Sequence, residues 1–526
     1  MSAQTSSASL KSSTGTTTMA EKWRPEKYQL KAMSWLLSHG NAGLFLDPGL
    51  GKTSIGLGAI KTLRRTEMPA KQGFLVIAPL RPVYNVWDGG NPESEPRKWS
   101  DFHGLKTSLL HGDGKNEALR TRADLYLMNP DGLSWLLDNV KPGAASWPFY
   151  GLLVDESTDF KHSNTQRFKL LRAILPYFRR RWIFTGTPAP NGLLDLFGQI
   201  YVLDLGNALG RYITRYRLDY FLPTGYGGHT WVPQRGAEEK IYRRIEPLVL
   251  RMSERDYLKL PRLLGALSHE GTKPALVRVK LPEKARRVYD QLEELFFIEL
   301  ENGSVTAANS GVKSIKLRQI ANGGIYVDKG GEEIEGGRPA KNNRKWNLVH
   351  EAKTDAVVEL LEELGKTAVI AYEFHHDLAR MRLHPMLKNV PAIGEGSIKE
   401  DTQLASALNH GDIRTLFVNP ASFSRGSNMQ AGADALIWAS MTYNYEHYDQ
   451  LVRRFWRKGR VRPFFVYHII AEETVDLAIL QAIGMKNRTQ RGLLDALRSY
   501  SLRRPVSKRT PQGTRKALKI HGVRSH

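Results

Sequence analysis

A glycine-rich turn between two apolar segments, within residues 43–60, constrains this chain more than any other feature. The segment has the sequence Gly-Leu-Phe-Leu-Asp-Pro-Gly-Leu-Gly-Lys-Thr and continues with apolar residues at helical spacing. This pattern predicts a buried strand at 44–46, a tight turn at 48–51 and a helix that begins at Lys52 and Thr53. Glycines in such a turn let backbone N–H groups close around a phosphate, which also faces the positive end of the helix dipole. The segment therefore predicts a phosphate cradle.

Two side chains of the predicted cradle have separate roles. The ammonium group of Lys52 is expected to reach the β- and γ-phosphates of a nucleotide, and the hydroxyl of Thr53 to take a coordination position on Mg²⁺. The first glycine of the strict G-x-x-x-x-G-K-T pattern would fall at Leu46, so a chance loop is the alternative for this motif taken alone. The residues predicted to bind the nucleotide here are Pro48, Gly49, Leu50, Gly51, Lys52, Thr53 and Ser54.

The charge balance of the chain indicates a polyanionic partner. Its 526 residues include 76 Lys and Arg against 53 Asp and Glu, which gives a formal net charge of +23. Nucleic acid is the simplest polyanion to match this surplus, and a basic surface that serves only solubility is the alternative. The absence of cysteine excludes disulfides and thiolate metal sites. No apolar run approaches the roughly 18 residues that a membrane span requires.

Further apolar runs, at residues 73–79, 125–128, 151–154 and 182–184, alternate with helical patterns along the chain. Continuous apolar runs bounded by turn signals are typical of strands that are buried on both faces. Strands that alternate with helices predict an α/β unit with a parallel sheet. Because ligands of such sheets bind at the carboxyl ends of the strands, functional side chains are expected there.

Two acids and two hydroxyls stand at such strand ends. Asp155 and Glu156 directly follow the run at 151–154. One carboxylate can hold Mg²⁺ through water while the next polarises the attacking water, as phosphoryl transfer requires. Thr185 and Thr187 follow the next strand and are predicted to sense the γ-phosphate and to pass its state to a neighbouring domain. Adjacent acids after a strand are also common in ordinary loops, and that alternative stays open.

Three further residues at this edge are candidates for contacts to a nucleic-acid backbone. Arg81 follows the run at 73–79, and Asn129 with Pro130 follows the run at 125–128. A guanidinium group and loop N–H groups can hold phosphates at such positions. Taken singly, the three are ordinary loop residues.

Residues 23–37, upstream of the cradle, carry apolar side chains at three- and four-residue spacing and are predicted to form a helix. Gln29 is predicted to bind the adenine edge through a pair of amide hydrogen bonds, with Arg24 or Tyr28 near the plane of the base. Packing against the core is the alternative role of this helix.

Several segments differ from the rest in composition. Residues 191–274 interleave arginines with aromatic residues, a pattern that either follows a nucleic-acid backbone or coats a helical insertion with solvated charge. Residues 329–343 are rich in glycine and are predicted to be a mobile loop. Residues 487–526 contain eleven Lys or Arg and one acid, and are predicted to be a partly disordered arm that binds polyanions. The Ser- and Thr-rich residues 1–20 are predicted to be a disordered tail, not a signal peptide.

A second α/β unit is predicted in the C-terminal half, with a helix at 355–364 and strands at 368–372, 415–418, 435–439 and 464–470. Between the last two strands lies the sequence Gln-Leu-Val-Arg-Arg-Phe-Trp-Arg-Lys-Gly-Arg. On a helix, its first glutamine and two of its arginines share one face at i, i+4 and i+7. These residues are Gln450, Arg454 and Arg457. A guanidinium group aimed across a cleft can neutralise charge that develops on a transferring phosphoryl group, and one more basic helix is the alternative.

Taken in order, these motifs resemble those of the Snf2-like branch of superfamily 2 helicases and translocases, most closely its compact bacterial and bacteriophage members. The resemblance covers residues 23–483. The matches are Gln29 (Q motif), Asp47 to Thr53 (motif I), Ala78 and Pro79 with Trp87 and Lys98–Trp99 (motif Ia), Asp155 and Glu156 (motif II), Thr185 to Pro188 (motif III), Gly426, Asn428 and Gln430 (motif V), and Gln450, Arg454, Arg457 and Gly459 (motif VI). The motif VI match keeps its spacing without a gap and is the most specific.

The resemblance implies an α/β fold of two tandem RecA-like P-loop domains that face each other across a cleft for ATP and Mg²⁺. It assigns the catalytic roles to Lys52, Asp155, Glu156, Arg454 and Arg457. It further assigns metal binding to Thr53 and Asp155, ATP contacts to Arg24, Gln29 and Gly426, coupling to Thr185, Thr187 and Gln450, and DNA contacts to Arg81, Asn129, Pro130 and Asn428. The implied domains are a tail (1–20), the ATP-binding lobe (21–190) with its helical and basic insertion (191–274), a helical linker and insertion (275–350), the second lobe (351–486) and a basic tail (487–526).

The activity implied by the resemblance is DNA-stimulated ATP hydrolysis coupled to movement on duplex or branched DNA, with branch migration or fork remodelling as possible outcomes. The expected location is the cytoplasm of a bacterium or an infected host, in part at the nucleoid. Two rival functions stay open. One is a strand-separating superfamily 2 helicase or RNA helicase, and the other is a non-catalytic DNA-binding scaffold, against which Lys52, Glu156 and Arg457 speak.

Overall fold

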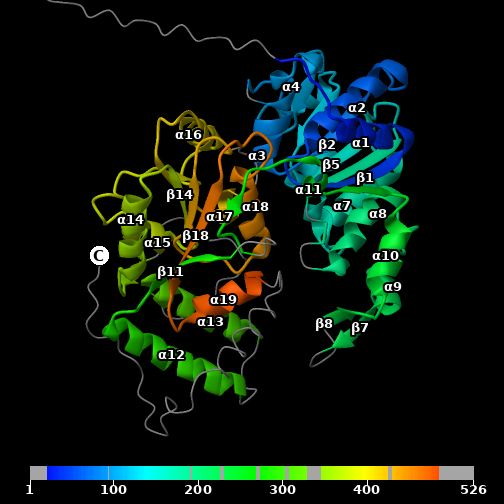
Figure 1. The fold of residues 1–526 in the computed structure, drawn as a ribbon. Coiled ribbons are helices and arrows are strands. Elements are labelled where there is room, and N and C mark those ends of the chain that lie inside the picture. The colour runs from blue at the N-terminus through cyan, green and yellow to red at the C-terminus, as the bar shows by residue number, and fades with distance from the viewer. Residues whose placement is uncertain are drawn as a thin grey trace, which may run out of the picture.

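Two parallel β-sheets, each flanked by helices, organise the molecule (Figure 1). The structure is a computed structural model, and it describes residues 21–92, 94–186, 188–189, 192–224, 230–267, 273–301, 307–327, 345–423 and 429–484. We name the described residues of 21–257 the first lobe and those of 263–484 the second lobe. The predicted tails, the predicted loop at 329–343, and the candidate residues Thr187, Gly426 and Asn428 lie outside the described residues.

The sheet of the first lobe has the strand order β3-β4-β2-β5-β6-β1-β9, and its strand pairings are parallel. Its strands are β1 (Asn41–Leu46), β2 (Gly73–Ile77), β3 (Thr107–Leu109), β4 (Leu125–Met128), β5 (Phe149–Asp155), β6 (Arg180–Thr185) and β9 (Val249–Met252). Apart from two helices between residues 205 and 248 that are described below, the α-helices of this lobe are α1 (Lys27–Ser38), α2 (Lys52–Thr66), α3 (Leu80–Pro82), α4 (Glu95–Lys98), α5 (Lys115–Arg120), α6 (Leu133–Asn139), α7 (Gln166–Ile174), α8 (Leu196–Asp204) and α11 (Glu254–Tyr257).

The register of the central strands brings three strand ends together. Phe45 of β1 pairs with Thr185 of β6, and Asp155 of β5 pairs with Phe184 of β6. The turn that follows β1 and the acids that follow β5 therefore lie at the same edge of the sheet, on either side of the end of β6. This edge is the carboxyl edge of a parallel sheet, where ligands bind in folds of this type.

The sheet of the second lobe has the strand order β10-β18-β17-β14-β16-β15, and β11 also pairs with β18. Its strands are β10 (Leu263–Leu264), β11 (Ala275–Val279), β14 (Ala368–Ala371), β15 (Ala392–Ile393), β16 (Thr415–Val418), β17 (Ala435–Trp438) and β18 (Phe464–Ala471), and a separate antiparallel pair joins β12 (Gly324–Tyr326) to β13 (Trp346–Leu348). The helices are α12 (Glu283–Glu301), α13 (Ala307–Asn322), α14 (Ala352–Leu364), α15 (His375–Met381), α16 (Ile398–His410), α17 (Pro420–Phe423), α18 (Tyr445–Phe455) and α19 (Val475–Gly484).

Two tandem parallel sheets confirm the predicted α/β fold class, and most predicted strands differ from the observed ones by only a few residues at their ends. The helix predicted at 23–37 is wrong at its start, because α1 begins at Lys27. Pro25 precedes that start, and a proline disfavours helical geometry in the residue before it. The second sheet also takes β10 and β11 from the region before residue 351, so that the proposed division into domains stays a proposal.

The segment between α8 and β9 extends away from the first sheet, on the lower right in Figure 1. It consists of α9 (Ile213–Tyr220), the antiparallel strands β7 (Phe221–Thr224) and β8 (Thr230–Pro233), and α10 (Ala237–Ile245). Buried Tyr216 and Ile241 attach it to the core of the first lobe. On its surface the Arg217 guanidinium lies 5.7 Å from the centre of the Trp231 ring.

The central strands of both sheets are buried on both faces, which explains why these strands are continuously apolar. Every residue of β2 and of β14 is buried. Separate clusters of apolar side chains cover the two faces of each sheet. Polar and apolar residues would alternate if one face met water. Among the described residues, no helix has the length and apolar character needed to cross a membrane.

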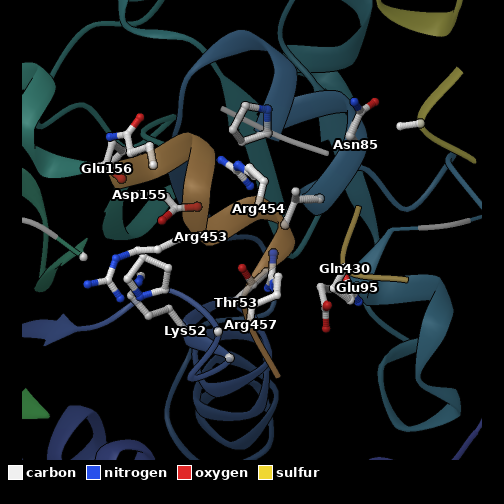
Figure 2. A pocket seen from close by; sticks show the side chains of 18 of the residues that line it. Lys52, Thr53, Asn85, Glu95, Asp155, Glu156, Gln430, Arg453, Arg454 and Arg457 are labelled. Atoms are coloured by element: carbon white, nitrogen blue, oxygen red, sulfur yellow. The ribbon is translucent and has the colours of Figure 1, made fainter. Parts of the chain in front are cut away.

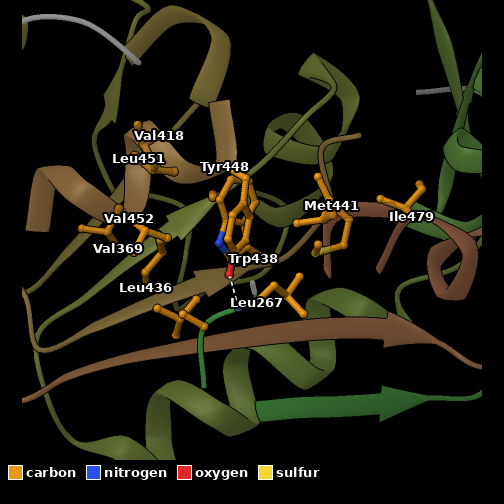
Figure 3. Close-up of a cluster of buried hydrophobic side chains, with 14 of the residues drawn as sticks. Leu267, Val369, Val418, Leu436, Trp438, Met441, Tyr448, Leu451, Val452 and Ile479 are labelled. Carbon is orange, nitrogen blue, oxygen red and sulfur yellow. Dashed lines mark hydrogen bonds between the residues drawn. The ribbon is translucent and has the colours of Figure 1, made fainter. Parts of the chain in front are cut away.

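Helix α18 is anchored in the core of the second lobe (Figure 3). The ring of Tyr448 stacks on that of Trp438 of β17, with 5.0 Å between the ring centres. The Tyr448 hydroxyl accepts a hydrogen bond from the backbone N–H of Leu267 at 2.8 Å and lies 3.0 Å from Nε2 of His468. Leu451 and Val452 on the same helix are buried beside it. The position of α18 therefore depends on several distant parts of the second lobe.

Candidate nucleotide-binding site

A cavity of about 560 Å³ lies between the two lobes and brings together all five residues predicted to be catalytic (Figure 2). From the first lobe it is lined by Pro48, Gly49, Gly51, Lys52, Thr53, Ser54, Asp155 and Glu156, and from the second by Gln450, Arg453, Arg454 and Arg457. Figure 2 shows Arg453, Arg454 and Arg457 around the same space as Lys52, Thr53 and Asp155. The charges from the two lobes therefore face each other across one space.

The turn after β1 has the backbone geometry of a phosphate cradle. Gly49 and Gly51 have φ values of 92° and 77°, which side chains other than glycine rarely adopt. Helix α2 begins directly after this turn, at Lys52, so the positive end of its dipole faces the cavity. The Nζ atom of Lys52 donates a hydrogen bond to the carbonyl oxygen of Leu46 at 2.7 Å. The lysine is thus held across its own turn, with its charge at the cavity wall.

The charges around Lys52 oppose one another. Burial lowers the pKa of Lys52, whereas the carboxylates of Glu156, Asp155 and Asp47 act in the opposite direction. Burial also raises the pKa of Asp155, and the hydrogen bond from the Trp87 indole N–H, 2.8 Å from Oδ2, partly offsets this effect. Burial therefore disfavours both the positive charge of Lys52 and the negative charge of Asp155. A ligand that brings a phosphate and a cation would stabilise both charges.

Glu156 stands in a strained backbone position. Its φ and ψ are both 62°, the left-handed conformation that a glutamate rarely adopts. Its Oε1 atom accepts hydrogen bonds from the hydroxyls of Thr158, at 2.8 Å, and Thr185, at 3.1 Å. The predicted coupling residue Thr185 is therefore in direct contact with the second acid. This contact joins the ends of β5 and β6.

The predicted helix face with three cavity residues is partly wrong. Helix α18 ends at Phe455, so Gln450 and Arg454 lie on the helix, whereas Arg457 lies two residues beyond its end. All three nevertheless line the cavity, because the chain turns after the helix towards the phosphate turn. A Cβ atom on Gly49 would lie 3.6 Å from Cβ of Arg457. Burial lowers the pKa of Arg457, and the carboxylates of Glu95 and Glu254 oppose that shift.

Other predicted nucleotide ligands have different surroundings. The side-chain amide of Gln29 donates to the Leu50 carbonyl at 3.2 Å and accepts from the Glu26 N–H at 3.0 Å. Gln29 is buried and supports the phosphate turn from behind, so in this conformation its amide is not available to adenine. Leu50 is fully buried, and Arg24 is exposed; neither lines the cavity. Adenine recognition by Gln29 and Arg24 stays a prediction.

The candidate DNA contacts are not gathered at the cavity. Arg81 instead forms an ion pair with Asp401 of α16 in the second lobe, with 2.5 Å between Nη2 and Oδ2. This pair engages one nitrogen of the guanidinium group and bridges the lobes, and the DNA contact of Arg81 stays a prediction. Asn129 and Pro130 follow β4 as expected, and the Asn129 amide lies 3.4 Å from a carboxylate oxygen of Asp131.

The residues present fit a magnesium-bound nucleotide. The Thr53 hydroxyl and the Asp155 carboxylate line the same cavity as the phosphate turn. No cluster of three or more His, Cys, Asp or Glu side chains suited to a metal occurs among the described residues. Mg²⁺ is usually held by one or two carboxylates together with phosphate oxygens and water, so two protein ligands are sufficient here.

The amino-acid sequence that forms this fold and this site matches a known protein family. Residues 28–322, more than half of the chain, match the model of the SNF2-related domain. The chain belongs to the SNF2-related family. This membership confirms the resemblance drawn from the motifs, and with it the activity that defines the family's core, the hydrolysis of ATP.

Two relatives extend the SNF2-related match. The putative protein p41 of Acyrthosiphon pisum secondary endosymbiont phage 1 is 31% identical over 492 residues, which cover 90% of this chain and 98% of the relative. An uncharacterized ATP-dependent helicase of Mycoplasma genitalium is 22% identical over 487 residues, or 88% of this chain. Our chain spans 41% of the length of that helicase. The phage relative agrees with the predicted phage-type member of the family.

A solved structure is also similar. The match is to the SWI2/SNF2 ATPase core of Sulfolobus solfataricus in complex with double-stranded DNA. It covers 89% of this chain and 92% of that core, with 22% sequence identity and a TM-score of 0.39.

Several charged residues at the site were not predicted from the sequence, among them Glu95, Arg453 and Glu254. Glu95 lines the cavity and accepts hydrogen bonds from the Ser54 hydroxyl and the Trp99 indole, both at 2.7 Å. Arg453 lines the cavity beside Arg454, and Glu254 contacts Arg453 from the first lobe. In the sequence, Arg453 could have been found from its position next to Arg454. Glu254 has no comparable signal, since it lies in a basic segment far from any motif.

Proposed function

We propose that this SNF2-related chain is a DNA-stimulated ATPase whose two lobes move along or remodel DNA. The observation that carries the proposal is the single cavity in which Lys52 and two acids of the first lobe face arginines of the second lobe. Groups on both sides of a cleft make hydrolysis dependent on the relative position of the lobes. Such a dependence is what a motor requires.

Each side of the cavity has its own part in the reaction. Backbone N–H groups of the turn at 48–51 and the Lys52 ammonium bind the phosphates of ATP, and Glu156 orients and deprotonates the attacking water. Thr53 and Asp155 would hold Mg²⁺, and the bound ion would supply positive charge to the phosphate oxygens. Arg454 and Arg457 stabilise the charge that develops on the transferring phosphoryl group.

The hydrolysis state reaches the lobes through the contacts of Glu156. Its Oε1 atom accepts from the hydroxyl of Thr185, at the end of β6. A change at the γ-phosphate that moves Glu156 therefore also moves the end of a central strand. With both lobes on a phosphate backbone, opening and closing of the cleft advances the protein along DNA.

Charge supports DNA as the partner. The whole chain carries a formal charge of +23, and the exposed arginines of the segment between α8 and β9 include Arg211, Arg215 and Arg235. Positive surface of this kind binds the phosphate backbone without sequence preference. The helicase relative is consistent with such a substrate. We place this activity in the bacterial or infected-host cytoplasm.

A comparison of ATPase rates tests the proposal. The full chain is assayed with Mg²⁺ and ATP alone, then with duplex DNA, single-stranded DNA, branched DNA or duplex RNA of matched length. We expect the largest stimulation with duplex or branched DNA. Stimulation by RNA alone favours the RNA helicase, and stimulation by single strands with displacement of a labelled strand favours an unwinding enzyme. Absence of turnover under every condition leaves only a DNA-binding scaffold.

A further inference from the structure

A partly buried ion pair joins the two lobes beside the cavity. The guanidinium group of Arg453, on α18 of the second lobe, lies 2.5 Å from Oε1 of Glu254, on α11 of the first lobe. Its Nε atom also lies 2.8 Å from the carboxylate of Asp449, one turn earlier on α18. Glu254 is only 2% exposed. One guanidinium group thus holds two carboxylates that belong to different lobes.

Glu254 is connected in turn to the phosphate turn. The Oδ2 atom of Asp47 accepts hydrogen bonds from the backbone N–H of Glu254 and from the hydroxyl of Ser253, both at 3.1 Å. The Asp47 N–H donates to the carbonyl oxygen of Met252 at 3.2 Å. Asp47 is the residue between β1 and the turn at 48–51. A continuous set of contacts therefore runs from the base of the phosphate turn to α18.

These contacts lie where the chain crosses between lobes. Strand β9, which ends at Met252, pairs with β1 in the first sheet, and β10, which begins at Leu263, pairs with β18 in the second. The crossing segment is fixed to the second lobe by the indole N–H of Trp456, which donates to the Pro261 carbonyl at 2.7 Å. The ion pair is thus placed to set the angle between the lobes.

The surrounding charges stabilise this ion pair, and burial makes it sensitive to the loss of either partner. Burial disfavours charge on Arg453, but the carboxylates of Asp449 and Glu254 raise its pKa above the ordinary value. Burial raises the pKa of Glu254, which Arg453 opposes. Among the described residues, the second carboxylate oxygen of Glu254 has no hydrogen-bond partner. Removal of Arg453 would leave a buried carboxylate without its counter-ion, a costly change in a protein interior.

We propose that Arg453 is a positioning residue that ties the phosphate turn to α18 and so places Arg454 and Arg457 against the transferring phosphate. The inference rests on the proposed function of the cavity. Arg454 follows Arg453 directly, and Arg457 follows the end of the same helix. A displacement of a catalytic group by about 1 Å can lower a rate by about a hundredfold, so a contact that sets the helix position controls the rate without touching ATP.

Paired substitutions test the positioning role. Glu254→Gln, Arg453→Gln and the double variant are assayed for kcat and KM in the presence of DNA and for the Kd of a fluorescent ATP analogue. We expect each single change to lower kcat by about tenfold to a hundredfold with a less than threefold change in Kd. The double variant should be no worse than either single one, because both remove the same contact. Arg453→Lys keeps a charge but not the fork that reaches two carboxylates, so it should restore kcat only in part.

Controls separate this role from its rivals. Arg462→Gln removes an exposed arginine paired with Asp434 of the same lobe and should leave kcat unchanged. Thermal unfolding shows whether each variant is folded. Normal kcat in folded Glu254→Gln overturns the positioning role alone. A Kd that rises in parallel in Arg453→Gln but not in Glu254→Gln would make Arg453 a direct phosphate ligand and also overturn it. Absence of turnover in the unchanged protein overturns the proposed function and this inference together.

Discussion

The two lobes have the same parallel architecture but supply their site residues in different ways. In the first lobe, the phosphate turn, Asp155 and Thr185 lie at the ends of adjacent paired strands, so that the sheet register alone places them. In the second lobe, Arg454 and Arg457 lie at the end of α18, whose position depends on packing and on contacts with distant segments. The first lobe therefore offers a preformed binding surface, whereas the second supplies groups whose placement can change.

The interiors of the lobes differ in a related way. In the second lobe, Lys353 and Asp476 form an ion pair at 2.6 Å with almost no exposure to solvent, and His468 is fully buried. In the first lobe, the buried guanidinium group of Arg181 donates instead to backbone carbonyls, including that of Leu203 at 2.8 Å. Because burial lowers the pKa of His468, the stability of the second lobe, and hence the positions of its arginines, depends on pH.

The largest effect is expected for Lys52→Ala, which removes the charge of the preformed surface. Because no other ammonium group of the described residues lines the cavity, turnover should fall to background. Steady-state ATP hydrolysis in the presence of DNA measures it, with thermal unfolding as a control for folding. Near-normal hydrolysis in a folded variant would refute the site in the first lobe.

Arg457→Ala tests the second lobe. If this guanidinium group completes the site only when the cleft closes, the rate should fall by about 10³. The Kd of ATP should change far less than in Lys52→Ala, since the phosphate turn remains. Single-turnover hydrolysis and equilibrium binding of a fluorescent analogue separate the two effects. An equal loss of binding in both variants would remove the difference between the lobes.

Acid should destabilise the second lobe through His468. Burial lowers the pKa of this imidazole from 6.5 to about 4. The Ala275 carbonyl can only accept, so Nδ1 carries the proton, and Nε2 accepts from the Tyr448 hydroxyl in the neutral ring. Above pH 6.5 this contribution to stability is complete. As the pH falls from 6.5 towards 4, the unfolded chain binds the proton first, so the free energy of unfolding should fall by about 1.4 kcal/mol per pH unit.

Denaturant unfolding of the full chain between pH 7 and pH 4.5 measures this slope. His468→Gln keeps hydrogen-bonding groups but cannot titrate. The slope of the unfolding free energy against pH should therefore be smaller by the contribution of one proton, about 1.4 kcal/mol per pH unit. His350, whose pKa burial lowers to about 3, contributes in the same direction and remains in that variant. An unchanged slope in His468→Gln would show that the imidazole is not the acid-sensitive group.

The smallest effect is expected for Lys458→Gln. Lys458 also bridges the lobes, to Glu26 at 3.2 Å, but the two side chains are 46% and 56% exposed. Such a pair contributes less than about 1 kcal/mol to stability because water and salt screen it. We expect kcat to change by less than twofold. A loss as large as that of Arg453→Gln would mean that exposure does not distinguish the two inter-lobe pairs.

Sequence patterns predicted the site of the first lobe well because its parts are local. A turn with glycines at 49 and 51 directly before a helix leaves the chain few conformations, and acids after a buried strand must stand at the edge of a sheet. The same patterns did not indicate the contacts between distant parts of the chain. Arg81 was predicted to face DNA, and in this structure it pairs with Asp401, which is 320 residues away in the sequence. Gln29 was predicted to face adenine, and in this structure its amide contacts the phosphate turn.

By itself, the sequence determined the family, the two parallel sheets and the residue types at the candidate nucleotide site, because these depend on short segments whose spacing restricts the backbone. Tertiary structure alone decided which charges meet across the cleft. Arg453 and Glu254 are 199 residues apart, and neither has a local pattern that indicates the other. Their contact exists because β9 pairs with β1 and α18 packs on β17, and the energy of a buried ion pair depends on that shared surrounding, not on either segment alone.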